Sequence, residues 1–291
     1  MKLGVFSVSM PEYDLQETVD ILKKIGYDGV EWRVQTIPEK KPENVVYETR
    51  YWSWNRSTVD IATIEETAGS IRKMCDDAGL EIFGFTTYLR PDQTEALKPV
   101  LRAAQSAGVK RVRVFTPSFT YAEDQESYPE LVKKTRKNIG TIEQLAKEHG
   151  VKVVFEIHHD NIFSSASAAI RLLDGFDPQY IGIIVDPGNM VYEGYENYRK
   201  VFQILGSYVD HIHIKNAKMA PGERDELGAV KWERVWAPLK EGTADLRQFI
   251  HELKQTGYDG TISVEDFNNE MPTLEKLQYC YDYIHELWEK A

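Results

Sequence analysis

The chain has 291 residues, of which 42% are hydrophobic and 28% are charged, and its formal net charge is −11. This composition is typical of a globular protein with an ordinary apolar core. The acidic balance and the lack of any basic run argue against a nucleic-acid-binding protein, because binding to a phosphate backbone needs clustered Lys and Arg. No apolar run approaches the ~18 residues that a membrane span requires. We therefore expect neither a nucleic acid nor a membrane as a partner.

The first residues and the cysteines predict a cytoplasmic location. The apolar stretch of MKLGVFSVSMPEYD meets Pro11 and Glu12 too soon for a secretory signal. Cys75 and Cys280 lie far apart on predicted helices and form no CxxC motif. Such cysteines are expected to be reduced and buried, as in a cytoplasmic protein.

Strands and helices alternate through the first half of the chain. Leu15, Val19, Leu22 and Ile25 have nearly helical spacing and predict the first helix, which Gly26 is expected to end. Later helices end at glycines in the same way. The expected strands cover residues 2–8, 27–33, 80–88 and 109–117, and the expected helices cover residues 14–25, 61–78, 94–107 and 128–149.

The second half continues this alternation without a linker or a change in composition. Alternating strands and helices predict a parallel sheet, and eight such units in a chain of this length predict a closed (β/α)₈ barrel, the TIM barrel. A doubly wound open sheet is the alternative, but no GxGxxG follows the first strand. We therefore predict a single domain over residues 1–291. The expected strands cover residues 151–159, 180–188, 209–215 and 260–266, and the expected helices cover residues 165–173, 195–205, 244–255 and 273–288.

Two connections exceed the usual length of ~2–6 residues and are expected to be long loops. They cover residues 34–60 and 216–243. Both follow the C-terminal ends of strands, where barrel enzymes carry their active sites. Their aromatic residues, among them Trp52, Trp232 and Trp236, either wall a sugar-sized pocket or form a contact between subunits of a homo-oligomer. We expect the second loop to close over the pocket.

Acidic and imidazole side chains stand near the ends of four successive predicted strands. Glu156 in VVFEIHH, Asp186 in IGIIVDPGN and Glu265 in TISVEDF each follow an apolar run, and His213 lies in VDHIHIK. A barrel brings these strand ends to one half of its rim, where three carboxylates would repel one another without a cation between them. Two Glu, one Asp and one His suit a divalent metal of the Mn, Mg, Co or Zn type. Taken singly, each acid also fits a helix cap or a partner for Arg, and the histidine fits a core position.

In this combination of motifs the chain resembles the xylose-isomerase-like barrel superfamily, in particular its sugar phosphate isomerase/epimerase branch, over nearly its whole length. The marks are the Glu of FEIHH, the Asp of VDPGN, the HxH of HIHIK, and the Glu of SVED preceded by GYDG. The resemblance implies that Glu156, Asp186, His213 and Glu265 bind one divalent metal. Mn²⁺ is the expected ion, with Mg²⁺, Co²⁺ or Zn²⁺ as alternatives. It also implies that Glu156 and Glu265 form the acid/base pair on opposite faces of the substrate.

The resemblance predicts a metal-dependent isomerase or epimerase that acts on a small keto-sugar or sugar phosphate. A carboxylate removes the proton next to the carbonyl group, and a metal stabilises the enediolate that forms. An inosose-dehydratase-like enzyme or another keto-sugar lyase shares this first step and is the alternative. A non-catalytic sugar-binding barrel is a further alternative. An apurinic-site endonuclease of the superfamily is disfavoured, because all seven histidines lie at or beyond position 149.

Two positions depart from the pattern of free-ketose epimerases. Where these enzymes carry a His three residues after the Asp ligand, this chain has Asn189, and where they carry an Arg six residues after the His ligand, it has Met219. Lysines near the second position could replace the arginine or hold a phosphate. Two inward residues of earlier strands, Glu31 and Arg113, are expected to form core ion pairs, and the alternative is that they reach the pocket. The residues expected to contact the substrate or lie directly behind the ligands are His158, Asn189, His211, Lys215 and Lys218.

Overall fold

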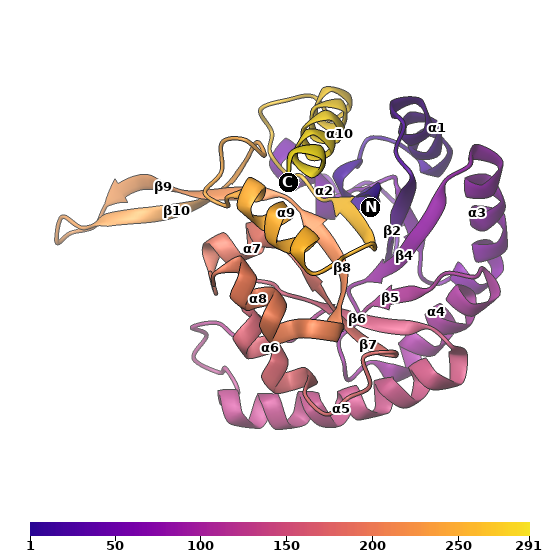
Figure 1. The fold of residues 1–291 in the computed structure, drawn as a ribbon, viewed down its shortest axis with the longest axis horizontal. Helices are drawn as coiled ribbons and strands as arrows, with labels where there is room; N and C mark the ends of the chain where they lie inside the picture. Colours follow the sequence, from indigo (N-terminus) through magenta and orange to yellow (C-terminus); the bar gives the residue numbers. More distant parts are fainter.

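Eight parallel strands close into a barrel in the computed structural model, which describes residues 1–291, and helices surround this barrel (Figure 1). Strand β1 pairs with both β2 and β11, and these two pairings close the ring. The predicted (β/α)₈ barrel is thus confirmed. In ring order the strands are β1 (Lys2–Phe6), β2 (Gly29–Gln35), β4 (Glu81–Thr87), β5 (Arg111–Arg113), β6 (Lys152–Glu156), β7 (Ile181–Val185), β8 (Val209–Ile214) and β11 (Thr261–Val264).

The outer layer consists mainly of one helix after each barrel strand. These helices are α1 (Leu15–Ile25), α3 (Ile64–Ala78), α4 (Thr94–Ser106), α5 (Tyr128–His149), α6 (Ala166–Leu173), α8 (Tyr198–Leu205), α9 (Leu246–Gln255) and α10 (Thr273–Lys290). Shorter elements complete the chain: η1 (Ser7–Ser9), η2 (Tyr47–Thr49), α2 (Arg50–Ser53), β3 (Thr58–Asp60), α7 (Pro187–Tyr192), η3 (Gly206–Tyr208), β9 (Asn216–Arg224) and β10 (Val230–Ala237). No helix combines the length and the apolar character needed to cross a membrane.

Local sequence explains where these elements begin and end. Helix α1 begins with a capping box, in which Asp14 and Glu17 each accept the other's backbone N–H. It ends at Gly26, whose φ of 108° suits glycine. All residues of β7 are buried, as expected for a strand covered by side chains inside the barrel and by helices outside it. A continuous core of 63 buried hydrophobic residues therefore fills the space inside the helical layer. Cys75 and Cys280 are free and buried, as expected.

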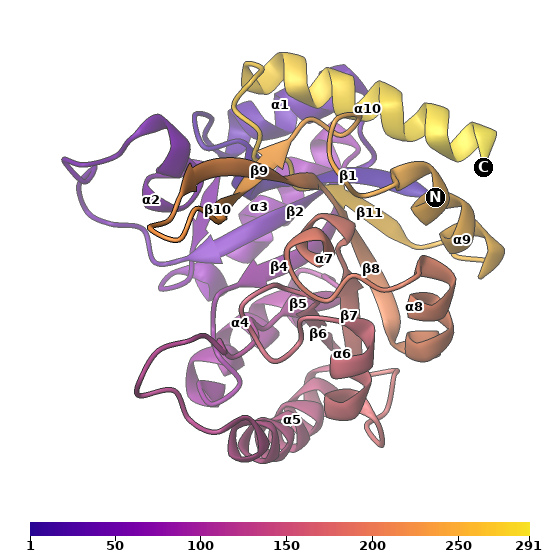
Figure 2. The same ribbon diagram turned by 90° about the vertical axis from the view of Figure 1, so that its left-hand side faces the viewer.

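The segment over residues 34–60 has more structure than the expected irregular loop. Strand β2 continues to Gln35, and the segment then includes α2 and β3, which pairs in parallel with β2. A small apolar cluster fixes α2 at the mouth of the barrel, because Tyr51 packs there with Phe6 and Phe267. Figure 2 shows α2 at the same end of the barrel as β9 and β10.

The expectation of an irregular loop over residues 216–243 is wrong. Most of this segment forms an antiparallel ribbon of β9 and β10, which projects from the barrel (Figure 1). Its turn is held by Asp225, whose N–H donates to the carbonyl oxygen of Ala229 over 2.9 Å, and by Gly228 at a φ of 84°. The many charged residues of the ribbon hide its strand character in the sequence, because both of its faces are largely exposed.

The N-terminal end of the barrel is closed by a partly buried cluster of charges. The carboxylate of Asp210 lies 2.6 Å from Nε of Arg111 and 2.8 Å from Nζ of Lys152. Arg111 also donates to the carbonyl oxygen of Phe83 and the hydroxyl of Thr261, so it joins several strands. Burial raises the pKa of Asp210, but the ion pairs to Arg111 and Lys152 outweigh burial and lower the pKa to about 2. This cluster lies at the start of β8, away from the predicted metal ligands.

Asp210→Asn is expected to lower the free energy of unfolding at pH 7 by about 2 kcal/mol, since each unit of pKa shift corresponds to ~1.4 kcal/mol. The carboxylate has a lower pKa in the folded state than in the unfolded state. Its contribution is therefore complete above pH ~4 and is lost as the pH falls toward 2. Urea unfolding of the wild-type and Asp210→Asn proteins between pH 7 and pH 2 measures this difference in stability. Asp259→Asn, at an exposed position, is the control. A stability difference that stays constant over this range would contradict the prediction.

Candidate metal centre and active site

The four predicted metal ligands lie together at the C-terminal end of the barrel. Glu156 ends β6, Asp186 follows β7, His213 lies in β8 and Glu265 follows β11, and these four strands are neighbours in the ring. One ligand atom from each residue lies within 4.8 Å of all the others, and all four residues are buried. Their assignment as ligands stays a prediction, but the geometry that it requires is present.

Two of the carboxylates use one oxygen for support and the other for the cluster. Oδ1 of Asp186 accepts the N–H groups of Gly188 and Asn189 at the start of α7, over 2.9 and 3.1 Å. Oε2 of Glu156 accepts from Arg113. The remaining oxygens, Oδ2 of Asp186 and Oε1 of Glu156, both accept from Nδ2 of Asn189, over 3.2 and 3.0 Å. The acids thus serve as a helix cap and as an ion-pair partner while they also face one another.

The imidazole of His213 has the orientation of a metal ligand. Its Nε2 lies 2.9 Å from Oε2 of Glu31, and its ring stacks on Phe6. Its Nδ1 is buried without a hydrogen bond and lies 3.3 Å from Oε1 of Glu156 and 3.4 Å from Oε2 of Glu265. We assign the proton to Nε2, because a carboxylate that accepts from one ring nitrogen leaves the lone pair of the other for a metal. The donor set of three carboxylates and one imidazole therefore fits a divalent ion.

Glu31 holds the imidazole of His213 from the side of the barrel interior. Its carboxylate, on β2, contacts both His213 and His211 and accepts from the hydroxyl of Thr86. Burial raises the pKa of Glu31, but the two imidazoles outweigh burial and hold the pKa well below its usual range. Glu31 was expected to form a core ion pair, and its place behind the predicted ligand His213 was not predicted. The available signal was an acid in the middle of the apolar strand GVEWRV.

Lys215 brings a positive charge into the carboxylate cluster. Its buried Nζ contacts the carboxylates of Asp186 and Glu265 and lies 3.8 Å from Glu156. The single positive charge of Lys215 does not neutralise the three carboxylates that it faces. Burial and the neighbouring Glu265 and Glu156 raise the pKa of Asp186 to about 7, although Lys215 opposes this shift. A divalent ion held by the same carboxylates would compete with the Lys215 ammonium for them.

A cavity of about 420 Å³ opens beside the cluster. The two long insertions each provide one of its aromatic walls, Trp52 from α2 and Trp236 from β10. Trp236 packs on Tyr192 and Phe267, with ring centroids 5.0 and 5.5 Å apart. The expectation that aromatic residues wall a sugar-sized pocket is confirmed. Only the base of the ribbon lies at this cavity, and Trp232 further out is 61% exposed.

Three of the five expected substrate-contacting residues line the cavity: His158, Asn189 and Lys215. His211 does not, because it lies one layer deeper than His213, with Nδ1 2.7 Å from the hydroxyl of Thr261 and Nε2 bonded to Glu31. Lys218 does not line it either, because the ribbon carries this residue away from the end of β8. His211 therefore lies behind the predicted ligands, which was one of its two expected positions, and Lys218 lies outside the cavity.

Two further residues line the cavity: Arg113, for which a place at the pocket was the alternative to a core ion pair, and His159, which had no predicted role. Arg113 holds Glu156 and stacks its guanidinium over the rings of Tyr88 and Phe115, 5.0 and 5.4 Å from their centroids. His159 stacks on His158 with ring centroids 4.3 Å apart, and burial lowers its pKa to about 3, so it is neutral near pH 7. Arg113 forms the expected core ion pair, but with a predicted metal ligand. The second histidine of FEIHH was the signal for His159.

The fold and the site together define a class: (β/α)₈ barrels with a buried Glu-Asp-His-Glu cluster at the C-terminal ends of four adjacent strands. A family model described as the xylose isomerase-like TIM barrel matches residues 19–283. The chain therefore belongs to the xylose isomerase-like TIM barrel family, as its motifs predicted.

Its similar proteins are sugar epimerases and dehydratases. The chain is 23% identical over 297 aligned positions to the L-ribulose-5-phosphate 3-epimerase UlaE of Shigella flexneri, with 99% of this chain and 95% of the relative covered. It is 26% identical over 157 positions to inosose dehydratase of Clostridium perfringens, with 52% and 51% covered. The crystal structure of the IOLI protein with a bound zinc atom has the same fold, with a TM-score of 0.73, 17% identity, and 100% and 99% covered. These similarities confirm the expectation of an enzyme related to sugar epimerases and dehydratases.

Glu31→Gln is expected to weaken metal binding by ~10- to 100-fold, the usual effect of removing the carboxylate behind a histidine ligand. The amide cannot hold the imidazole in the same charge state and orientation. Competition with a chromogenic chelator measures the affinity, and circular dichroism checks the fold. Ser263→Ala is the matched control, because Ser263 bonds to His211 and not to His213. His213→Ala should bind no metal tightly. Unchanged affinity in Glu31→Gln would contradict the role of Glu31.

Proposed function

We propose that this chain is a divalent-metal-dependent epimerase or isomerase of a keto-sugar or keto-sugar phosphate. The observation that carries the proposal is the position of the carboxylates of Glu156 and Glu265, which lie 3.3 and 3.4 Å from Nδ1 of His213, beside a cavity of sugar size. Two carboxylates in this arrangement can remove a proton from one face of a substrate and return a proton to the other face. The epimerase relative covers nearly the whole chain, whereas the dehydratase relative covers about half of it, and this favours epimerisation.

Each proposed acid/base residue is held in place by its neighbours. Arg113 and Asn189 bond to the two oxygens of Glu156, and Lys215 bonds to Glu265. Burial raises the pKa of Glu156, but Arg113 and His213 outweigh burial and hold the pKa well below its usual range, so the group is an ionised base. The apolar rings of Trp52, Trp236 and Phe267 line the cavity beside these carboxylates.

A divalent ion held by Glu156, Asp186, His213 and Glu265 supplies Lewis acidity, which stabilises the negative charge that develops on the substrate. We propose Mn²⁺ as this ion, with Mg²⁺, Co²⁺ or Zn²⁺ as alternatives, because oxygen-rich donor sets suit Mn²⁺. We also propose a cytoplasmic location, which the two free cysteines support.

Dehydration is the second candidate, and Lys215 is the observation that favours it. Its ammonium lines the cavity among the carboxylates. From this position it could donate a proton to a hydroxyl group that leaves from the carbon next to the proton-abstraction site.

Solvent-deuterium incorporation distinguishes these reactions. The metal-loaded protein is incubated in D₂O with a panel of keto-sugars and their phosphates, and the products are identified by NMR. An epimer or isomer that carries deuterium at the carbon next to the carbonyl supports the proposal. A dehydrated product supports the second candidate. Exchange and turnover absent for the entire panel would reject both.

Glu156→Gln and Glu265→Gln are each expected to reduce turnover by ~10²- to 10⁴-fold, the usual value of a positioned acid or base. The change keeps the size of the side chain and one oxygen atom but removes the base. Metal occupancy is measured alongside, because both residues are also proposed ligands. Glu270→Gln, at an exposed position on the same rim, is the control. For an epimerase, each variant should lose proton exchange with one epimer and keep it with the other. A metal-loaded Glu265→Gln protein with parental exchange and turnover contradicts the assignment.

Trp236→Ala is expected to raise KM by up to about tenfold, because an aromatic wall contributes ~0.5–1.5 kcal/mol beyond the area that it buries. Trp232 on the same strand provides the matched control, since its side chain is exposed and lies away from the cavity. Steady-state kinetics with the substrate identified above measure both variants. Equal KM values for Trp236→Ala and Trp232→Ala would show that the base of the ribbon does not contact the substrate.

A further inference from the structure

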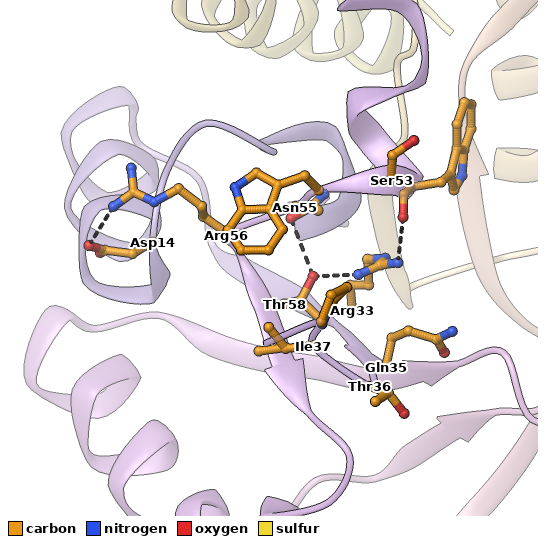
Figure 3. Close-up of a pocket in the computed structure, with 12 residues that line it drawn as sticks. Asp14, Arg33, Gln35, Thr36, Ile37, Ser53, Asn55, Arg56 and Thr58 are labelled. Atoms are coloured by element: carbon orange, nitrogen blue, oxygen red, sulfur yellow. Dashed lines mark hydrogen bonds and ion pairs between the residues drawn. The ribbon is translucent and has the colours of Figure 1, made fainter. Parts of the chain in front are cut away.

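A second cavity of about 380 Å³ lies at the mouth of the barrel (Figure 3). Trp52 lines both cavities. The second cavity is formed by the end of β2, the residues that follow it, and the chain from α2 to β3. Nothing in the proposed chemistry at the metal cluster uses it.

Arg33 is the unusual residue of this cavity. It lies two residues beyond Glu31 on β2, so both side chains point into the barrel, and Arg33 lies one layer closer to the mouth. Its side chain lines the cavity, yet the residue is only 6% exposed. Its Nη1 donates to the hydroxyl of Thr58 over 2.5 Å, and its Nη2 lies 3.4 Å from the carbonyl oxygen of Trp52 (Figure 3). Its Nε is buried without a hydrogen-bond partner.

Arg33 also has no ion-pair partner, in contrast to two other inward-facing arginines. Arg111 pairs with Asp210, and Arg113 pairs with Glu156. The acid that lines the second cavity, Asp14, already caps α1 and pairs with the guanidinium of Arg56 over 3.3 Å. A largely buried charge without an ion-pair partner is poorly compensated within the protein. A counter-ion that arrives with a ligand would compensate this charge.

The rest of the lining suits a phosphate group. The side chains of Gln35, Thr36 and Trp54 line the cavity and are free of hydrogen bonds within the protein, so their polar groups are available. A phosphate monoester has three terminal oxygens for such donors and for the guanidinium, whereas a carboxylate has two. The guanidinium of Arg33 also lies over the ring of Tyr88, 5.3 Å from its centroid, and Tyr88 lines the catalytic cavity.

We propose that the cavity around Arg33 binds the phosphate group of a sugar phosphate whose reacting carbon lies at the metal cluster. This inference rests on the proposed function and names its substrate class. The sugar phosphate then extends along the side chain of Trp52, which lines both cavities, from the metal cluster to Arg33. The guanidinium of Arg33 selects the phosphorylated sugar over the free sugar.

The kinetic test compares one keto-sugar with its phosphate ester. The ratio of kcat/KM for the phosphate to kcat/KM for the free sugar is expected to fall ~10- to 100-fold in Arg33→Gln, the value of a charge-assisted hydrogen bond. Arg90→Gln is the matched control, because Arg90 lies at the same end of the barrel but lines neither of the two cavities. An unchanged ratio in Arg33→Gln overturns the proposal, since a purely structural role would lower both values together.

A binding test works without any turnover. Inorganic phosphate is titrated into the metal-loaded wild-type, Arg33→Gln and Arg90→Gln proteins by calorimetry. Phosphate should bind at least ~10-fold more weakly to Arg33→Gln than to the other two. Equal binding to all three overturns the proposal, because a phosphate bound directly to the metal would survive the change. Acetate that binds as tightly as phosphate would overturn the choice of phosphate over carboxylate.

Two further variants cover the case in which Arg33→Gln does not fold. Thr36→Val changes an exposed residue and is expected to weaken phosphate binding by ~2- to 10-fold. Arg33→Lys keeps the charge and should retain part of the affinity. Unchanged affinity in both overturns the proposal. If the wild-type protein binds phosphate through Arg33 but exchanges no proton in any keto-sugar, the proposed function fails while the phosphate site stands.

Discussion

Three carboxylates held close together in a buried site repel one another, and the structure at the C-terminal end of the barrel depends on how this repulsion is balanced. Glu156 gives one oxygen to Arg113, Asp186 gives one to the N-terminus of α7, and Lys215 lies between Asp186 and Glu265. The contacts from Arg113 and from α7 each occupy one oxygen and turn the other toward the cluster, whereas Lys215 binds oxygens that face the cluster. The groups that reduce the repulsion between the carboxylates therefore also orient them as a set of ligands. Glu31 and His213 complete this set on the side of the barrel interior.

The barrel could be predicted because each of its strands and helices is encoded by a short, continuous stretch of sequence. Each strand is an apolar run, each helix has its own periodicity, and glycines such as Gly26 and Gly150 end the helices in the left-handed conformation. The ribbon of β9 and β10 could not be predicted in this way. Its strands bury little, so apart from the short run Val230–Glu233 their sequence lacks a sustained alternation of apolar and polar residues, and their pairing depends on a turn around Gly228.

At the site, too, the features encoded by local sequence could be predicted and those that depend on distant neighbours could not. The predicted ligands stand at the ends of apolar strands, so the barrel topology alone brings them together. Glu31 and Arg33 lie inside β2, and their roles depend on which neighbours they meet across the barrel, which a single sequence does not contain. Lys215 shows a related difficulty, since lysine is rarely buried and only the surrounding carboxylates explain its place. His211 shares the strand face of His213, yet two residues of separation place it one layer deeper.

The ribbon leaves two strands without neighbours on their outer sides, because β9 and β10 form a sheet of their own. Unpaired backbone edges of this kind are templates on which other chains can add strands and aggregate. Pro221 interrupts the edge of β9 because it has no N–H to offer, and charged residues such as Glu233 and Arg234 stand along β10. A proline and charged side chains along this protruding pair of strands therefore disfavour the addition of further strands at its edges.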